Sequence, residues 1–150
     1  MRKKNGNLEL GEKQVINIMG PADEDKRDGF DTLIDHAPEK LHFVKQSLLK
    51  FTNTHLSKVG YPVKDLENDF SDGVRLILLL GLLEGYFVPL HNFNLHPANV
   101  EDKIQNMNYA FKLLDEVGLT QPRNGPYEIV HKDLKSTLRI IYSLFIKYKN

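Results

Sequence analysis

The stretch DFSDGVRLILLLGLLEG, residues 69–85, constrains the fold of this chain more than any other part of its sequence. It begins with acids and a serine and then becomes almost continuously aliphatic. Its apolar part, residues 76–83, is far shorter than the roughly 20 apolar residues that a membrane-spanning helix needs. A helix that is apolar on every side is typically buried among other helices. The stretch therefore predicts a central helix, with Ser71 or Asp69 as its N-cap and Gly85 just after its end.

The other regular patterns along the chain are also helical. Residues 23–37 have apolar side chains at helical spacing and stop before Pro38, which predicts a short amphipathic linker helix. Longer helices are expected within residues 38–60, within residues 96–118 and from Asp133 to the end of the chain. No segment alternates polar and apolar residues as a strand would. We expect an all-α fold with about four main helices and shorter ones between them.

The length of 150 residues is that of one compact domain. Residues 1–22 are polar, lack a sustained period and end in Gly20-Pro21, which favours a turn or a linker. The expected organisation is a flexible tail or linker remnant at 1–22, a linker helix at 23–37 and a folded domain at 38–150.

The composition argues against several classes of function. Twenty basic and twenty acidic residues cancel, whereas a nucleic-acid-binding domain is usually basic. The chain has no cysteine, which excludes disulfides and thiolate zinc sites and fits a reducing, cytoplasmic compartment. Its histidines, glycines and serines lack the spacing of a metal site, a phosphate-binding loop or a catalytic nucleophile. We predict a binding module without a cofactor or a metal, and not an enzyme.

The helix that begins at Pro38 has apolar residues outside its core stripe. At roughly 100° per residue, Lys40, Ser47 and Phe51 lie along one flank, and Phe43 lies nearly opposite the core stripe. One interpretation is that the preceding helix covers this surface. The other is that it is a second apolar face for a partner. The pattern leaves both open.

The last helix presents a similar choice. Lys135, Arg139, Tyr142, Ile146 and Lys149 cluster beside its core stripe. Such a stripe is often a solvated face with snorkelling side chains. It could also hold an acidic amphipathic helix, because the apolar residues would contact leucines and the cations would attract carboxylates. The two interpretations have equal support from the pattern.

The segment EGYFVPLHNF places three aromatic residues in an expected loop. Loop aromatics often pack back into the core, and we expect this of two of the three, Tyr86, Phe87 and Phe93. Phe87 is the candidate for an exposed anchor that binds a partner.

Several of these segments resemble a known family. The stretch DFSDGVRLILLLGLLEG resembles the leucine-rich third-helix region of calponin homology domains, and DLKSTLRIIYSLFIKY resembles their last helix. More narrowly, RDGFDTLIDHAPEKL, LLGLLEGYFVPLHNF and DLKSTLRIIYSLFIKYKN are together similar to the C-terminal calponin homology domain of the parvins, also called actopaxin or affixin. The resemblance runs from Arg27 to Asn150, and three long blocks in order make it specific.

The resemblance implies a calponin homology fold preceded by a linker helix, and an adaptor role at integrin adhesions. The implied partners are the pseudokinase domain of integrin-linked kinase and the acidic, leucine-rich LD motifs of paxillin, with a connection to the actin cytoskeleton. The implied LD groove, together with the cationic flank of the last helix, comprises Gly29, Thr32, Lys40, Phe43, Val44, Ser47, Leu48, Lys135, Arg139, Tyr142 and Lys149. Phe51 and Phe87 are the candidates for the kinase-binding surface.

Two positions depart from the family pattern. Phe43 stands where a valine is usual, and Lys149 stands where an arginine is usual, so the cation cannot form a bidentate fork with a carboxylate. Full-length parvins have a second, N-terminal domain of this type, so we expect the chain to be a piece of a longer protein. The alternative function is direct binding to F-actin, as in other calponin homology domains.

Overall fold

The computed structural model describes residues 10–19, 37–86, 88–119 and 125–149. Every regular element in these ranges is helical, and none of the described residues forms a strand, which confirms the all-α fold. The elements are α1 (Leu10–Met19), α3 (Pro38–Leu56), η1 (Ser57–Val59), α4 (Leu66–Asp69), α5 (Val74–Glu84), η2 (Leu90–Asn92), α6 (Val100–Glu116), α7 (Pro126–Val130) and α8 (Leu134–Tyr148).

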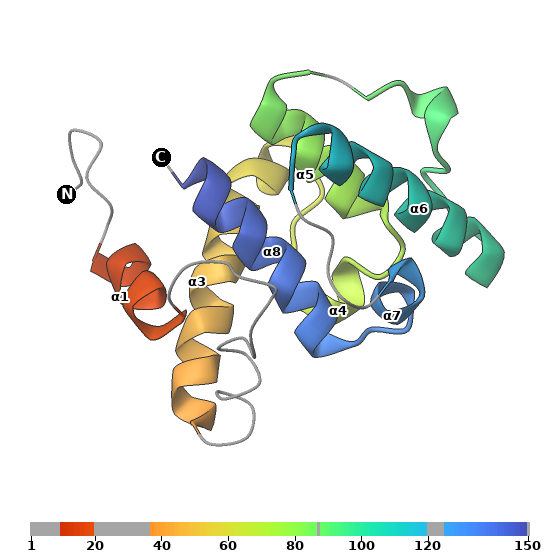
Figure 1. Ribbon diagram of the computed structural model, residues 1–150. Coiled ribbons are helices and arrows are strands. Elements are labelled where there is room, and N and C mark those ends of the chain that lie inside the picture. Colours follow the sequence, from red (N-terminus) through yellow and green to blue (C-terminus); the bar gives the residue numbers. More distant parts are fainter. Residues whose placement is uncertain (1–9, 20–36, 87, 120–124, 150) are drawn as a thin grey trace.

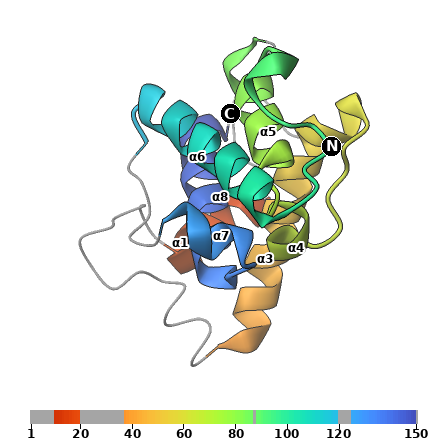
Figure 2. The same cartoon turned by 90° about the vertical axis from the view of Figure 1, so that its right-hand side faces the viewer.

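Helix α5 is the centre of the domain, as its sequence predicted. Leu76, Ile77, Leu79 and Leu80 are each at most 1% exposed. Helices α3 and α6 both pack against α5, which lies between them in Figures 1 and 2. Because its neighbours cover it on several sides, α5 needs no polar face.

The start of α5 differs from the prediction, since neither Ser71 nor Asp69 caps it. The helix begins at Val74, whose amide donates a hydrogen bond to Oδ1 of Asp72 at 3.0 Å. Asp69 instead ends α4, and its Oδ2 accepts hydrogen bonds of 2.7 Å and 3.0 Å from two backbone amides just before that helix. The left-handed backbone of Gly73, with φ +84°, separates the two helices.

Helix α8 packs against α3, α4 and α7, and its start is as predicted. The Asp133 carboxylate accepts hydrogen bonds from the amide of Ser136 at 3.0 Å and from its hydroxyl at 2.7 Å. At the other end of α8, the Tyr148 hydroxyl donates a hydrogen bond to the Glu84 carboxylate. This bond ties the end of α8 to the end of α5.

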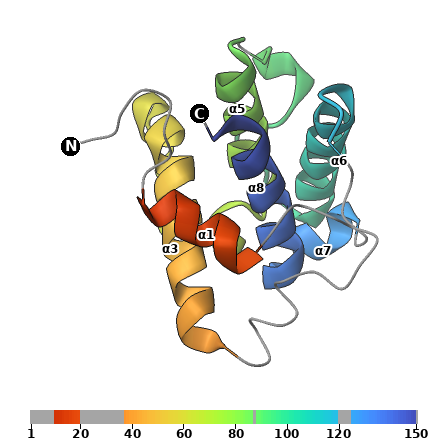
Figure 3. The same ribbon diagram turned by 60° about the vertical axis from the view of Figure 1, so that its left-hand side comes forward.

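Helix α1 packs against α3, on the opposite side of the domain from α6 and α7 (Figures 1 and 2). Figure 3, with this side forward, shows α1 crossing in front of α3 and running toward α8. We expected residues 1–22 to be a tail or linker remnant, and this docked helix was not predicted. Residues 20–36 lie outside the described part of the chain, and with them nearly all of the expected linker helix.

Candidate functional site

The candidate peptide-binding residues of α3 divide between its buried and its accessible sides. Val44 and Leu48 are fully buried. Lys40 is exposed, and Phe43 and Ser47 are half-buried. Phe43 packs at the edge of the apolar core, so part of its ring stays accessible. The accessible part of this helix therefore combines a cation with an aromatic surface.

Tyr142, the candidate contact in α8, is buried rather than exposed on the flank of the helix. It is 4% exposed, and its ring stacks on that of Phe145 with the centroids 6.1 Å apart. Burial raises the pKa of Tyr142 to about 12, because the phenolate would lose its hydration. Tyr142 thus belongs to the packing between α8 and its neighbours.

Phe51, a candidate kinase contact, is also part of this packing. Its ring lies edge-to-face on Phe145, with the centroids 5.6 Å apart, and it is 8% exposed. The ring of Phe51 also lies edge-to-face to that of His55, with the centroids 5.6 Å apart. Burial, together with the positive charge of Lys58, lowers the pKa of His55. Phe51 joins α3 to α8, and its role in kinase binding stays a prediction.

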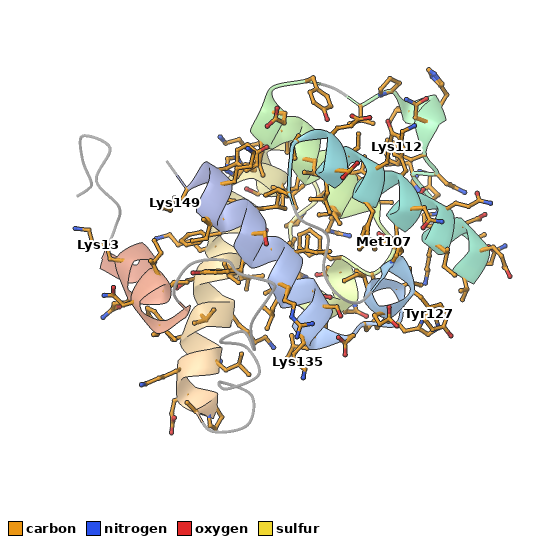
Figure 4. The ribbon with its side chains drawn as sticks, in the orientation of Figure 1. Lys13, Met107, Lys112, Tyr127, Lys135 and Lys149 are labelled. Carbon is orange, nitrogen blue, oxygen red and sulfur yellow. The ribbon has the colours of Figure 1, made fainter. Side chains whose placement is uncertain are left out.

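The cations of α8 lie at its two ends. Lys135 and Arg139 are half-buried in the first turns, and Lys149 is half-buried just after the last turn (Lys135 and Lys149 are labelled in Figure 4). Burial opposes the ionisation of Asp133, but hydrogen bonds from Ser136 and the charges of Lys135 and Arg139 hold the pKa of Asp133 below its usual range.

Lys149 adds positive charge just after the C-terminal end of α8. Its Nζ donates a hydrogen bond to the carbonyl of Ile146 at 3.0 Å, which suits a cation at a helix C-terminus. α8 thus carries positive charge at both ends of a helix that packs against α3.

A groove of about 370 Å³ runs between α1 and the first turns of α3. It is lined by Gln14, Asn17, Ile18, Glu39, Lys40 and Phe43. Lys40 and Phe43 are two of the residues that the family resemblance implies for peptide binding, a role that stays a prediction, whereas the side that α1 contributes was not predicted. The spacing of Val15 and Ile18, three residues apart, was the available signal, but it was too short to predict a helix.

The loop after α5 presents apolar side chains to solvent. Tyr86 is 42% exposed and Leu90 is 62% exposed, whereas Phe93 packs inward at 9%. Tyr86 and Leu90 thus give this loop an accessible apolar surface. Phe87 lies outside the described residues, as do Gly29 and Thr32 of the implied peptide groove.

The described residues hold no group of three or more histidine, aspartate or glutamate side chains that could bind a metal ion. Within the same ranges, no helix is both long enough and apolar enough to cross a membrane. The accessible features of the described residues include the groove between α1 and α3 and the exposed apolar side chains of the loop after α5.

Comparison with known proteins identifies the family. Residues 43–150 match the calponin homology (CH) domain. Beta-parvin of Mus musculus is 56% identical over 125 residues, which are 83% of this chain and 34% of that protein. Gamma-parvin of Homo sapiens is 43% identical over 136 residues, or 91% of this chain and 41% of that protein. Alpha-actinin-3 of Homo sapiens is 31% identical over 118 residues, or 79% of this chain and 12% of that protein.

The matched part of the chain therefore spans less than half the length of each of these relatives. The match to the CH domain covers most of the described residues, from Phe43 in α3 to the end of α8. The parvin relatives cover more of the chain, at higher identity, than alpha-actinin-3 does. The helical fold, the domain match and these identities together show that the chain is a calponin homology domain of the parvin family.

Proposed function

We propose that this domain is a non-enzymatic adaptor at integrin adhesions in the cytoplasm, where it helps to link adhesion to the actin cytoskeleton. Its proposed partners are acidic leucine-rich helices, such as the LD motifs of paxillin, and the pseudokinase domain of integrin-linked kinase. Membership of the parvin family supports this role, since the resemblance implies these partners.

The observation that carries the peptide-binding proposal is the pairing of Lys40 with Phe43 on α3. An exposed cation beside a half-buried ring suits an amphipathic acidic helix, because leucines can pack on the ring while carboxylates approach the cation. Lys135, Arg139 and Lys149 add positive charge on α8. These charges would favour the acidic helix during approach and select against basic ones.

A charge-reversal experiment tests this proposal. A fluorescently labelled synthetic acidic leucine-rich peptide is titrated with wild-type chain, and its anisotropy is measured. Lys40→Glu should weaken binding about tenfold, since it removes an attraction and adds a repulsion. The matched control is Lys112→Glu, at an exposed position of α6 far from α3 (Figure 4). Equal effects of the two reversals would argue against α3 as the binding surface.

The kinase-binding proposal rests on the loop that follows α5. The exposed Tyr86 and Leu90 flank the position of Phe87, and aromatic side chains often dominate the binding energy of an interface. A pull-down of the integrin-linked kinase pseudokinase domain with Phe87→Ala should recover much less kinase than wild type. Tyr127→Ala, at a 57% exposed aromatic on α7, is the control and should behave like wild type.

Direct binding to F-actin is the alternative function. The similarity to alpha-actinin-3 favours it, whereas a formal net charge of zero gives no general attraction to an acidic filament. Co-sedimentation of the chain with F-actin separates the two proposals. Strong co-sedimentation without any partner protein would favour direct actin binding over the adaptor role.

A further inference from the structure

Helix α1 is anchored to the domain by Val15. This side chain is fully buried and belongs to the same apolar cluster as Val44 and Leu48 of α3. Ile16 and Ile18 are half-buried against that cluster. A helix of 10 residues is marginal by itself in water, so the helical form of α1 depends on its contacts with α3.

The docked helix α1 lies beside the residues of α3 that are proposed to bind a peptide. Ile18 and Asn17 line one side of the groove, and Lys40 and Phe43 line the other. Lys40 and Phe43 are the pair on which the peptide-binding proposal rests. A second helix that packs on Phe43 from the same direction would collide with α1, because two packed helices lie about 8–10 Å apart.

The apolar side chains that are proposed to contact a peptide are buried in the structure with α1 docked. Val44 and Leu48 are 0% exposed, and Tyr142 is 4% exposed. A leucine-rich helix can gain apolar contacts with these residues only if something that covers them moves away. Of the described helices that contact α3, α1 is the one that lies outside the matched domain, which starts at Phe43. It is therefore the helix whose release leaves the domain intact.

We propose that α1 is an intramolecular occupant of the peptide-binding surface of α3, and that a peptide must displace it to bind. This inference rests on the proposed peptide-binding function and adds its regulation. The chain exists in a closed form with α1 docked and an open form with α1 released. The apparent affinity for a peptide is the intrinsic affinity multiplied by the fraction of open chains.

The alternative arrangement is that α1 is a fixed wall of the groove and contacts the peptide. The two arrangements predict opposite effects when α1 is released. If α1 is an occupant, its release strengthens peptide binding. If α1 is a wall, its release removes contacts and weakens binding.

The variant Val15→Asp distinguishes these arrangements, because an unpaired charge at a buried position expels α1 from its site. Lys13→Asp is the matched control, since Lys13 is exposed on the outer side of α1 and points away from α3 (Figure 4). Hydrogen exchange of the α1 amides reports release, and circular dichroism and urea unfolding check the rest of the domain. Val15→Ala is a milder second variant that should act in the same direction.

Peptide affinity is measured by anisotropy with the same labelled acidic leucine-rich peptide. Val15→Asp should abolish protection of the α1 amides and tighten peptide binding by about tenfold. The free energy gained by burying one valine side chain corresponds to about this factor in an equilibrium constant. The added negative charge opposes an acidic peptide, so tighter binding would have to come from release. Lys13→Asp should leave α1 protected and change affinity by no more than about twofold.

The wild-type chain offers a reciprocal test, because coupling between two binding events acts in both directions. Saturating peptide should raise the exchange rate of the α1 amides in wild type. Unchanged or weaker affinity in a folded Val15→Asp chain, or α1 amides that stay protected with peptide bound, would overturn the inference and leave the proposed function intact. A peptide that binds neither chain would contradict both.

Discussion

Gly73 and Asn106 lie so close together that a Cβ added to Gly73 would be 2.7 Å from the Cβ of Asn106. The Asn106 side chain is buried, and its Nδ2 donates to the carbonyls of Asp72 at 3.0 Å and Asn94 at 2.8 Å. Its Oδ1 accepts from the amide of Asn94 at 2.8 Å. One side chain of α6 thereby holds both the start of α5 and the loop after it, which contains the proposed kinase surface.

Gly73→Ala should destabilise the domain strongly. The new methyl group meets α6, and the residue must also keep a left-handed φ of +84°. We expect the free energy of unfolding to fall by about 3 kcal/mol, measured by urea denaturation. Gly60→Ala is the matched control, because Gly60 has φ +82° with nothing within 4 Å of an added Cβ. That change should cost only about 1–2 kcal/mol, and equal losses would show that the contact with Asn106 is unimportant.

Phe51→Leu tests whether Phe51 is a packing residue or a partner contact. Loss of the edge-to-face pair with Phe145 and of some buried volume should lower the free energy of unfolding by about 1–2 kcal/mol. Urea denaturation and kinase pull-down are measured on the same preparation. A variant as stable as wild type that no longer recovers the kinase would show that Phe51 contacts the partner directly.

Lys149→Arg should tighten the binding of an acidic leucine-rich peptide. Arginine can form two parallel hydrogen bonds to a carboxylate, whereas lysine acts as a point charge. We expect an affinity gain of about twofold to fivefold at low salt, which shrinks as salt screens the pair. Lys149→Gln should lose affinity. Anisotropy at two salt concentrations measures both, and equal affinities for the three chains would remove Lys149 from the site.

The raised pKa of Tyr142 predicts a loss of stability in alkali. Burial raises this pKa to about 12, whereas an exposed tyrosine in the unfolded chain ionises near 10. As the pH rises, Tyr142 therefore loses its proton in the unfolded chain before it does so in the folded chain. The contribution of protonated Tyr142 to the free energy of unfolding is complete below pH 10 and is lost as the pH rises toward 12. Urea denaturation between pH 9 and pH 12 should show a smaller decline for Tyr142→Phe than for wild type. Parallel declines would contradict the assignment to Tyr142.

Local signals were sufficient to predict the main helices of the domain. The aliphatic run of α5 predicted its central burial, and Pro38 and Asp133 predicted the starts of α3 and α8, because these signals act within a few residues. The start of α5 was predicted wrongly because Gly73 adopts a left-handed turn against Asn106, a residue far away in sequence.

Helical register was a weaker guide to the candidate site. It placed Tyr142 and Phe51 on the flanks of their helices, yet both are buried. A register gives the direction of a side chain around its own helix, but it does not tell which other helix covers that direction. The docking of α1 on α3 was missed for the same reason, because the register of α3 does not show that a segment before it packs on its surface.

Binding of an acidic leucine-rich helix by α3 and α8 together is the property on which the proposed function chiefly rests. The most direct test is an NMR titration of the isotope-labelled chain with such a peptide, followed through backbone amide shifts. We predict that the shifts concentrate at Lys40, Phe43, Tyr142 and Lys149 and on the displaced helix α1, with none at Tyr127 or Lys112 on the far side (Figure 4). No shifts at the first four residues at saturating peptide, or the largest shifts on α6 and α7, would contradict peptide binding by α3 and α8.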